Sequence, residues 1–422
     1  MRDASAGLLR SNRDFRWYWA GQTLSVVGTQ VTAVALPLLA ALSLHVGPAG
    51  VSAVATASFL PNLLFSLPAG QWLEGRHKRR IMIWADIIRA ALLAVIPVAG
   101  LTGRLSLALL VVIAFGVGAA SVVFEIGGFA YVPTLVAEGD LGAANRAMQG
   151  SVTVAQAGGP GLAGVIVQVL GPPLTMLVDA VSYVASAFCV AAARRPEPAV
   201  ENDAQRGGVW EGVRIIMANP FLRALTAHAS IYNAASQIFL VNLVIWLVQD
   251  RGVSPGMYGV ALSGAGGGAF VGTMIALRLA GRVGYGRAFA ASLLLSTGVP
   301  LLVATLPWRG TSLGLALAAL QLLAGIGLGS ANVLSITLRQ TVIPHRQLAR
   351  TNGGYRLLMY GSIPIGSALG GVLGDALGSR AGVAIGTMGL ALSALPMFAR
   401  TIRRLRDPKD ARTQAESGLA TI

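Results

Sequence analysis

Twelve apolar segments, each long enough to cross a lipid bilayer, dominate this chain of 422 residues. A membrane-spanning helix needs about 20 mostly apolar residues. Only 12% of the residues are charged, whereas a soluble globular chain carries about 25%, so the chain lacks the polar surface that water requires. We therefore predict an all-α polytopic membrane protein. The predicted spans are 17–43, 49–73, 81–102, 105–129, 147–170, 173–193, 220–248, 256–280, 287–307, 311–338, 351–377 and 380–400.

The basic residues indicate how these spans are oriented. If the amino terminus lies in the cytoplasm, 27 of the 32 Lys and Arg residues fall in cytoplasmic segments, and the exceptions are Arg104, Arg251, Arg309, Arg380 and Arg89. This bias is typical of positive-inside topology. It predicts a multi-pass protein of the cell inner (plasma) membrane with both termini in the cytoplasm. The net charge of +15 does not indicate nucleic-acid binding, because the basic residues separate apolar runs and form no soluble basic face.

The chain is predicted to consist of two related halves. The longest connection, 194–219, is rich in Pro, Gly and charge and separates six spans from six. Pro133, Asn145 and Pro160 recur in the second half as Pro344, Asn352 and Pro364, which is the mark of a duplicated six-helix unit. The predicted domains are residues 1–193, a flexible cytoplasmic linker at 194–219, and residues 220–422 with a basic cytoplasmic tail.

Long segments of the chain resemble a known family of transporters. The opening LLRSNRDFRWYWAGQTLSVVGTQVTAVALPLLA, the segment FLPNLLFSLPAGQWLEGRHKRRIMIWADIIRA and the later NGGYRLLMYGSIPIGSALGGVLGDALGSRAGV resemble the enterobactin-exporter and macrolide-efflux-type branch of the major facilitator superfamily. The resemblance implies two pseudo-symmetric six-helix bundles, with spans 1, 4, 7 and 10 around a central cavity. It also implies secondary active transport by alternating access.

The loop between spans 2 and 3 resembles the gating latch of that superfamily, G-x-x-x-D-R-x-G-R-R. Gly75 stands where the family has Arg, which favours a weakened or rearranged latch. The alternative interpretation is that the basic residues only anchor the end of the span. The residues that match the latch are Gly70, Glu74, Lys78, Arg79 and Arg80.

Span 5 carries a Gly- and Pro-rich segment that matches the motif G-x-x-x-G-P-x-x-G, which is associated with antiporters. Its central residues are Gly159, Pro160 and Gly164, and Pro364 takes the related position in span 11. Proline removes a backbone hydrogen bond and small residues permit close helix approach, so we predict a hinge here. Ordinary glycine-mediated packing is the alternative.

Four ionisable residues within the spans are candidates for proton coupling, because charge inside a bilayer is costly and is usually kept for function. Asp86 and Arg89 lie three residues apart in span 3, and we expect them to neutralise each other. Glu125 in span 4 and Asp179 in span 6 lack such a partner nearby in the sequence. Glu125 is the first choice for the proton carrier, and either acid could instead be a hydrogen-bonded structural residue.

Uncharged polar residues follow stripes on the spans that the resemblance places around the cavity. Amides separated by small and apolar residues suit a neutral or weakly cationic amphipathic compound, although each could instead bond a neighbouring helix. The candidates for the cavity wall are Gln22, Thr29, Gln30, Ser121, Asn233, Gln237, Gln321 and Asn332.

These features predict a transporter and no enzyme. The sequence shows no catalytic cluster of nucleophile, base and acid, no nucleotide-binding loop and no metal-ligand pattern, so we expect no cofactor and no metal. The leading hypothesis is a monomeric, proton-coupled exporter of a small amphipathic molecule such as a drug, antibiotic or secondary metabolite. The alternatives are a siderophore exporter and a membrane sensor or scaffold that keeps the fold without transport.

Overall fold

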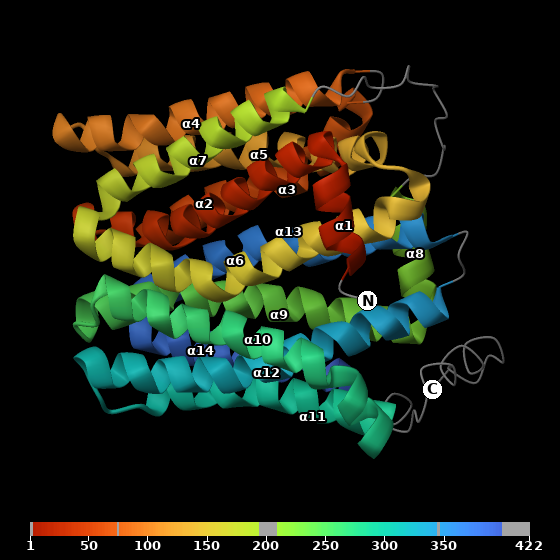
Figure 1. Cartoon of the computed structure of the whole chain (residues 1–422). Helices are drawn as coiled ribbons and strands as arrows, with labels where there is room; N and C mark the ends of the chain where they lie inside the picture. The colour runs from red at the N-terminus through yellow and green to blue at the C-terminus, as the bar shows by residue number, and fades with distance from the viewer. Residues whose placement is uncertain (1–2, 74–75, 194–208, 344–346, 399–422) are drawn as a thin grey trace. The chain divides into compact units, whose positions relative to one another are not determined.

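The structure is a computed structural model that describes residues 3–73, 76–193, 209–343 and 347–398. Within those ranges the regular secondary structure is helical throughout, as Figure 1 shows. Twelve of these helices are long and apolar enough to cross a membrane. The predicted fold class is therefore confirmed. The chain divides into two compact units, Met1–Val46 with Ala53–Ala204, and Gly47–Ser52 with Gln205–Ile422.

The first unit contains six long helices preceded by one short helix. Its main contacts join α2 to α6 and α7, and α4 to α5 and α7. These four interfaces place α7 between α2 and α4, where the polar side chains described below meet. The helices are α1 (Asp3–Ser11), α2 (Arg13–Ser43), α3 (Pro48–Leu73), α4 (Lys78–Leu101), α5 (Leu107–Leu135), α6 (Leu141–Leu170) and α7 (Pro172–Ala192).

The second unit also contains six spans, and its closest helix pair is α10 with α12. A Cβ at Gly268 would lie 2.0 Å from the carbonyl oxygen of Leu322, so only glycine permits this approach of the two backbones. Three spans end in other helix types: a π-helical turn Ile245–Asp250 and the 3-10 segments Val299–Thr305 and Leu395–Phe398. The helices are α8 (Val209–Ala218), α9 (Pro220–Val244), α10 (Pro255–Val283), α11 (Tyr285–Gly298), α12 (Gly310–Val342), α13 (Leu348–Leu377) and α14 (Ser379–Ser393).

Local sequence signals account for many helix boundaries. Asn12 and Asn219 are N-caps whose side-chain oxygens accept backbone N–H groups of the first turn. Single glycines with positive φ join α6 to α7 and α13 to α14, namely Gly171 at 77° and Gly378 at 88°. Because L side chains rarely adopt this backbone conformation, glycine is required at both turns. The two turns occupy related positions in the two halves.

Several helices are longer than their apolar runs predict. α6 begins at Leu141, where span 5 was expected from residue 147, because Ala143 and Ala144 pack in a buried cluster of the first unit. α12 continues to Val342, which packs in a corresponding cluster of the second unit. These helix ends are amphipathic and so fall outside a search for apolar residues. Helix α8 lies within the predicted linker 194–219, whereas residues 194–208 and the basic tail 399–422 lie outside the described residues.

Candidate functional site

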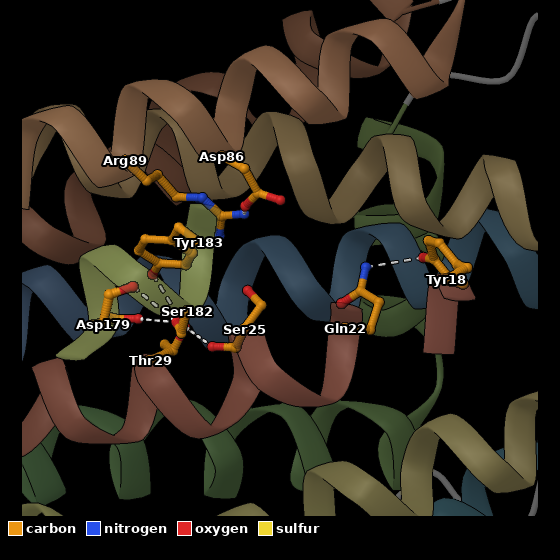
Figure 2. A network of polar contacts seen from close by, with 9 residues as sticks. All are labelled: Tyr18, Gln22, Ser25, Thr29, Asp86, Arg89, Asp179, Ser182 and Tyr183. Carbon is orange, nitrogen blue, oxygen red and sulfur yellow. Dashed lines mark hydrogen bonds and ion pairs between the residues drawn. The ribbon is translucent and has the colours of Figure 1, made fainter. Parts of the chain in front are cut away.

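Three charged side chains are buried among the residues that the structure describes, and all three belong to the first unit. They are Asp86 and Arg89 on α4 and Asp179 on α7. Figure 2 shows them together with polar side chains of α2. We call Asp86, Arg89 and Asp179 the charge cluster.

Asp86 and Arg89 form an ion pair on one face of α4. The carboxyl accepts a hydrogen bond from the guanidinium, and the two side chains are 0% and 3% exposed. Arg89 also lies between two aromatic rings, with its Cζ 4.1 Å from the ring centroids of both Phe124 and Tyr183. These rings offset part of the cost of removing a guanidinium from water. The expected neutralisation between Asp86 and Arg89 is present in this geometry.

Asp179 accepts hydrogen bonds from the hydroxyl groups of two side chains. Thr32 of α2 donates to one carboxyl oxygen, and Ser182 donates to the other at 2.9 Å. A Cβ at Gly28 of α2 would lie only 2.2 Å from the Asp179 carboxyl oxygen. The carboxyl therefore occupies space that exists because α2 has a glycine at this position.

A second set of contacts connects the charge cluster to the surface of the first unit. Thr29 of α2 is exposed, and its hydroxyl lies 3.1 Å from that of Tyr183. Thr29 also donates to the Ser25 carbonyl at 2.9 Å. Tyr183 also stacks on Arg89. The exposed Thr29 hydroxyl is therefore connected to the buried Arg89 guanidinium through one side chain, Tyr183 (Figure 2).

The remaining α2 candidates pack against neighbouring helices. Gln22 donates to the Tyr18 hydroxyl at 2.9 Å, as drawn in Figure 2. Gln30 packs on α6, where a Cβ added at Gly159 would lie 2.6 Å from the Cβ of Gln30. Pro160 beside it is buried, so the Gly-Pro segment of α6 faces α2. Gly164 of the same helix is also buried.

The two α5 candidates are less buried than the charge cluster. Ser121 is half-buried and Glu125 is exposed. The sequence could not show this difference between Glu125 and Asp179, because both occur in apolar runs. Exposure depends on which face of each helix meets a neighbour.

In the second unit, the predicted cavity residues are uncharged and come from α9 and α12. Asn233 of α9 donates to the Met359 carbonyl of α13 at 3.1 Å, Gln237 is half-buried, Gln321 is buried and Asn332 is exposed. Pro364 lies buried inside α13.

Two polar residues of α9 bridge helices in ways that sequence reasoning missed. Asn242 is 0% exposed and donates to the Gly370 carbonyl at 2.9 Å. His228 Nδ1 lies 2.8 Å from the Ser393 carbonyl. An asparagine within the apolar run LVNLVIW was the available signal for Asn242, because a buried amide needs a partner.

Part of the predicted latch contacts the first unit itself. Arg79 donates from Nε to the Val190 carbonyl at 3.2 Å, and its guanidinium also bonds the Ala191 carbonyl. These are carbonyl groups of the last turn of α7, which the helix leaves without partners, so Arg79 joins the start of α4 to the end of α7. Gly70 lies in α3, Lys78 is half-buried and Arg80 is exposed. Glu74 lies outside the described residues.

No group of three His, Cys, Asp or Glu side chains that could hold a metal ion occurs within the described ranges. Cys189, the single cysteine of the sequence, is buried on α7.

The fold is that of a transporter class with many solved members. A crystal structure of a bacterial homologue of the iron transporter ferroportin, in an inward-facing state, matches with a TM-score of 0.74 and 16% identity, over 91% of this chain and 98% of that chain. This likeness concerns the fold alone. With the twelve spans and the relatives below, it defines the protein as a transporter of the major facilitator superfamily, and therefore as a multi-pass membrane protein with a small-molecule substrate.

Within that class, the chain belongs to the family described as transmembrane secretion effector, MFS_3, whose model matches residues 7–418. It is similar to the multidrug efflux pump Tap of Mycolicibacterium fortuitum, with 28% identity over 90% of this chain and 93% of that protein. It is also similar to the uncharacterised MFS-type transporter YvqJ of Bacillus subtilis, with 23% identity over 81% of each. The resemblance to the superfamily and the expectation of a transporter in place of an enzyme are confirmed.

Proposed function

We propose that this protein is a proton-coupled exporter of small amphipathic compounds, working as a monomer by alternating access. The proposed setting is the inner membrane, with both termini in the cytoplasm, as the positions of the basic residues indicate. Export is supported by the similarity to Tap, a multidrug efflux pump. Uncharged amides among the cavity candidates favour a neutral or weakly cationic substrate.

The observation that carries proton coupling is the charge balance of the charge cluster. It contains two carboxyl groups and one guanidinium, and the guanidinium is bonded to Asp86. Asp179 has hydroxyl partners, which stabilise a carboxylate less than a cation does. Because an uncompensated charge inside the membrane is costly, one bound proton balances this cluster. We assign that proton to Asp179.

The contacts of α2 supply a route by which substrate binding could change the proton occupancy. α2 carries the exposed Thr29 and also Thr32, which donates to Asp179. A substrate that holds α2 against α7 would maintain the Thr32–Asp179 hydrogen bond. This donor stabilises the carboxylate form, so substrate binding favours proton release from Asp179 through one helix.

Glu125 is the competing assignment. Its position in an apolar run favours it, but its side chain is exposed on α5, whereas Asp179 is fully buried. Asp179 belongs to the charge cluster with the Asp86–Arg89 ion pair and accepts a hydroxyl hydrogen bond from α2, so its protonation changes the charge balance of that cluster. We therefore propose Asp179 in its place and use Glu125 as a comparison.

The test is uphill transport of ethidium, used as a cationic amphipathic probe, into inside-out membrane vesicles that carry a proton gradient. Asp179→Asn should abolish accumulation while sparing exchange of labelled ethidium between two filled compartments. Asp140→Asn, at an exposed acid before α6, is the matched control and should transport normally. All variants are compared at equal amounts of monodisperse protein, which separates lost coupling from lost folding.

The outcomes distinguish the assignments. If Asp179→Asn accumulates ethidium and Glu125→Gln does not, the proton carrier is Glu125. If Asp179→Asn, Asp86→Asn and Glu125→Gln all accumulate the probe, proton coupling through these acids is wrong. If wild-type protein moves ethidium in no assay, the substrate class is wrong.

A further inference from the structure

Helix α8 is a short amphipathic helix that is fixed to the second unit by one face. A Cβ at Gly354 of α13 would lie 2.7 Å from the backbone of Gly212, so the two helices are in direct backbone contact. Ile216, 1% exposed, packs in a buried cluster with residues of α9, α11 and α12. Asn219 then caps α9 directly after α8. The inner face of α8 is therefore part of the core of the second unit.

The opposite face of α8 combines an aromatic, a basic and an apolar side chain. Trp210 is 77% exposed, Met217 is 53% exposed, and Arg214 between them is exposed. Their spacing of four and three residues places them in one stripe. A Trp and an apolar side chain beside an Arg are typical of helices that lie in the interface between water and lipid.

The charge around α8 favours an anionic partner. Because consecutive spans run in opposite directions, one end of the second unit holds α8, the starts of α9, α11 and α13, and the ends of α10 and α12. Among the side chains described at this end, seven arginines stand against one acid, Glu211: Arg214, Arg223, Arg278, Arg282, Arg287, Arg339 and Arg356.

The other end of the second unit lacks this imbalance. Three arginines there, Arg251, Arg309 and Arg380, stand against Asp250 and Asp375 within the described ranges. The positive charge is therefore concentrated at the end that carries the exposed Trp210.

We propose that the outer face of α8 lies in the membrane interface and binds anionic phospholipid headgroups. Arg214 and the neighbouring arginines contact the phosphates, while Trp210 and Met217 enter the boundary with the acyl chains. Because α8 is packed against α13 and followed directly by α9, this anchor holds the entry points of two spans at a fixed depth. The proposal is independent of what the protein transports.

The test measures the depth of Trp210 in nanodiscs that hold one copy of the full chain. The signal is the fluorescence difference between wild type and Trp210→Phe, which isolates this residue among the seven tryptophans. Phosphatidylcholine discs are compared with and without phosphatidylglycerol, using brominated acyl chains as the membrane quencher and acrylamide as the aqueous quencher. Retention of phosphatidylglycerol by the purified protein is measured in parallel.

We expect brominated lipid to quench Trp210, and phosphatidylglycerol to shield it from acrylamide. Arg214→Gln should weaken phosphatidylglycerol binding by about fivefold, the effect of one basic residue near an anionic surface. Arg309→Gln, an exposed arginine at the other end of the unit, is the matched control and should change nothing. The proposal is overturned if acrylamide reaches Trp210 equally in both lipids, or if shielding requires two copies per disc, which would identify a second chain as the partner.

Discussion

Removing the charge of Asp86 alone should destabilise the protein more than removing the charges of Asp86 and Arg89 together. The two side chains are 0% and 3% exposed, so neither charge reaches bulk water when its partner is lost. Breaking a buried ion pair costs about 3–5 kcal/mol, whereas replacing both members with uncharged residues is often nearly neutral. The two single substitutions and the double substitution form a thermodynamic cycle.

The rings around Arg89 set the expected difference between the two single variants. In Asp86→Asn, the guanidinium keeps its contacts with Phe124 and Tyr183, which lowers the expected loss to about 3 kcal/mol. Arg89→Met loses these contacts and also leaves Asp86 unpaired, so about 4 kcal/mol is expected. The double variant should lose about 2 kcal/mol, which gives a coupling energy of about 5 kcal/mol.

The assay is reversible unfolding in mixed micelles during titration with sodium dodecyl sulfate, followed by tryptophan fluorescence. Arg356→Met is the matched control, because Arg356 is exposed and its Cζ lies 5.5 Å from the ring centroid of the exposed Tyr360. It should leave the unfolding midpoint unchanged. If the losses in the two single variants add up to that of the double variant within about 0.5 kcal/mol, the ion pair does not stabilise the first unit and the reasoning fails.

Two further predictions concern helix packing and topology. Gly159→Ala should destabilise the protein by about 1–3 kcal/mol, because its Cβ would lie 2.6 Å from the Cβ of Gln30. The neighbouring Gly158→Ala meets no atom within 4 Å and should stabilise the helix by up to about 1 kcal/mol; equal unfolding midpoints for the two variants would contradict the contact. Epitope tags inserted near residue 206 and after residue 410 should bind antibody only after the cells are permeabilised, and labelling of either tag in intact cells would refute the cytoplasmic placement of the termini and the linker.

The sequence by itself determined the spans of this protein. A bilayer requires each spanning segment to satisfy its own backbone hydrogen bonds and to present apolar side chains, so each span can be recognised from about 20 consecutive residues. Span 11 was predicted at 351–377, and the helix α13 covers Leu348–Leu377. The N-caps Asn12 and Asn219 are local signals of the same kind, because each accepts backbone N–H groups of its own first turn.

The tertiary structure decided which polar residues form the candidate site. Asp86 and Arg89 could be paired from the sequence because they lie one helical turn apart. Asp179 could not be distinguished from Glu125, because its partner Thr32 is 147 positions away in the sequence. The order of apolar and polar residues along the sequence does not show which faces of α2 and α7 meet. That contact decides whether a carboxyl group in an apolar helix is buried with hydroxyl donors or exposed.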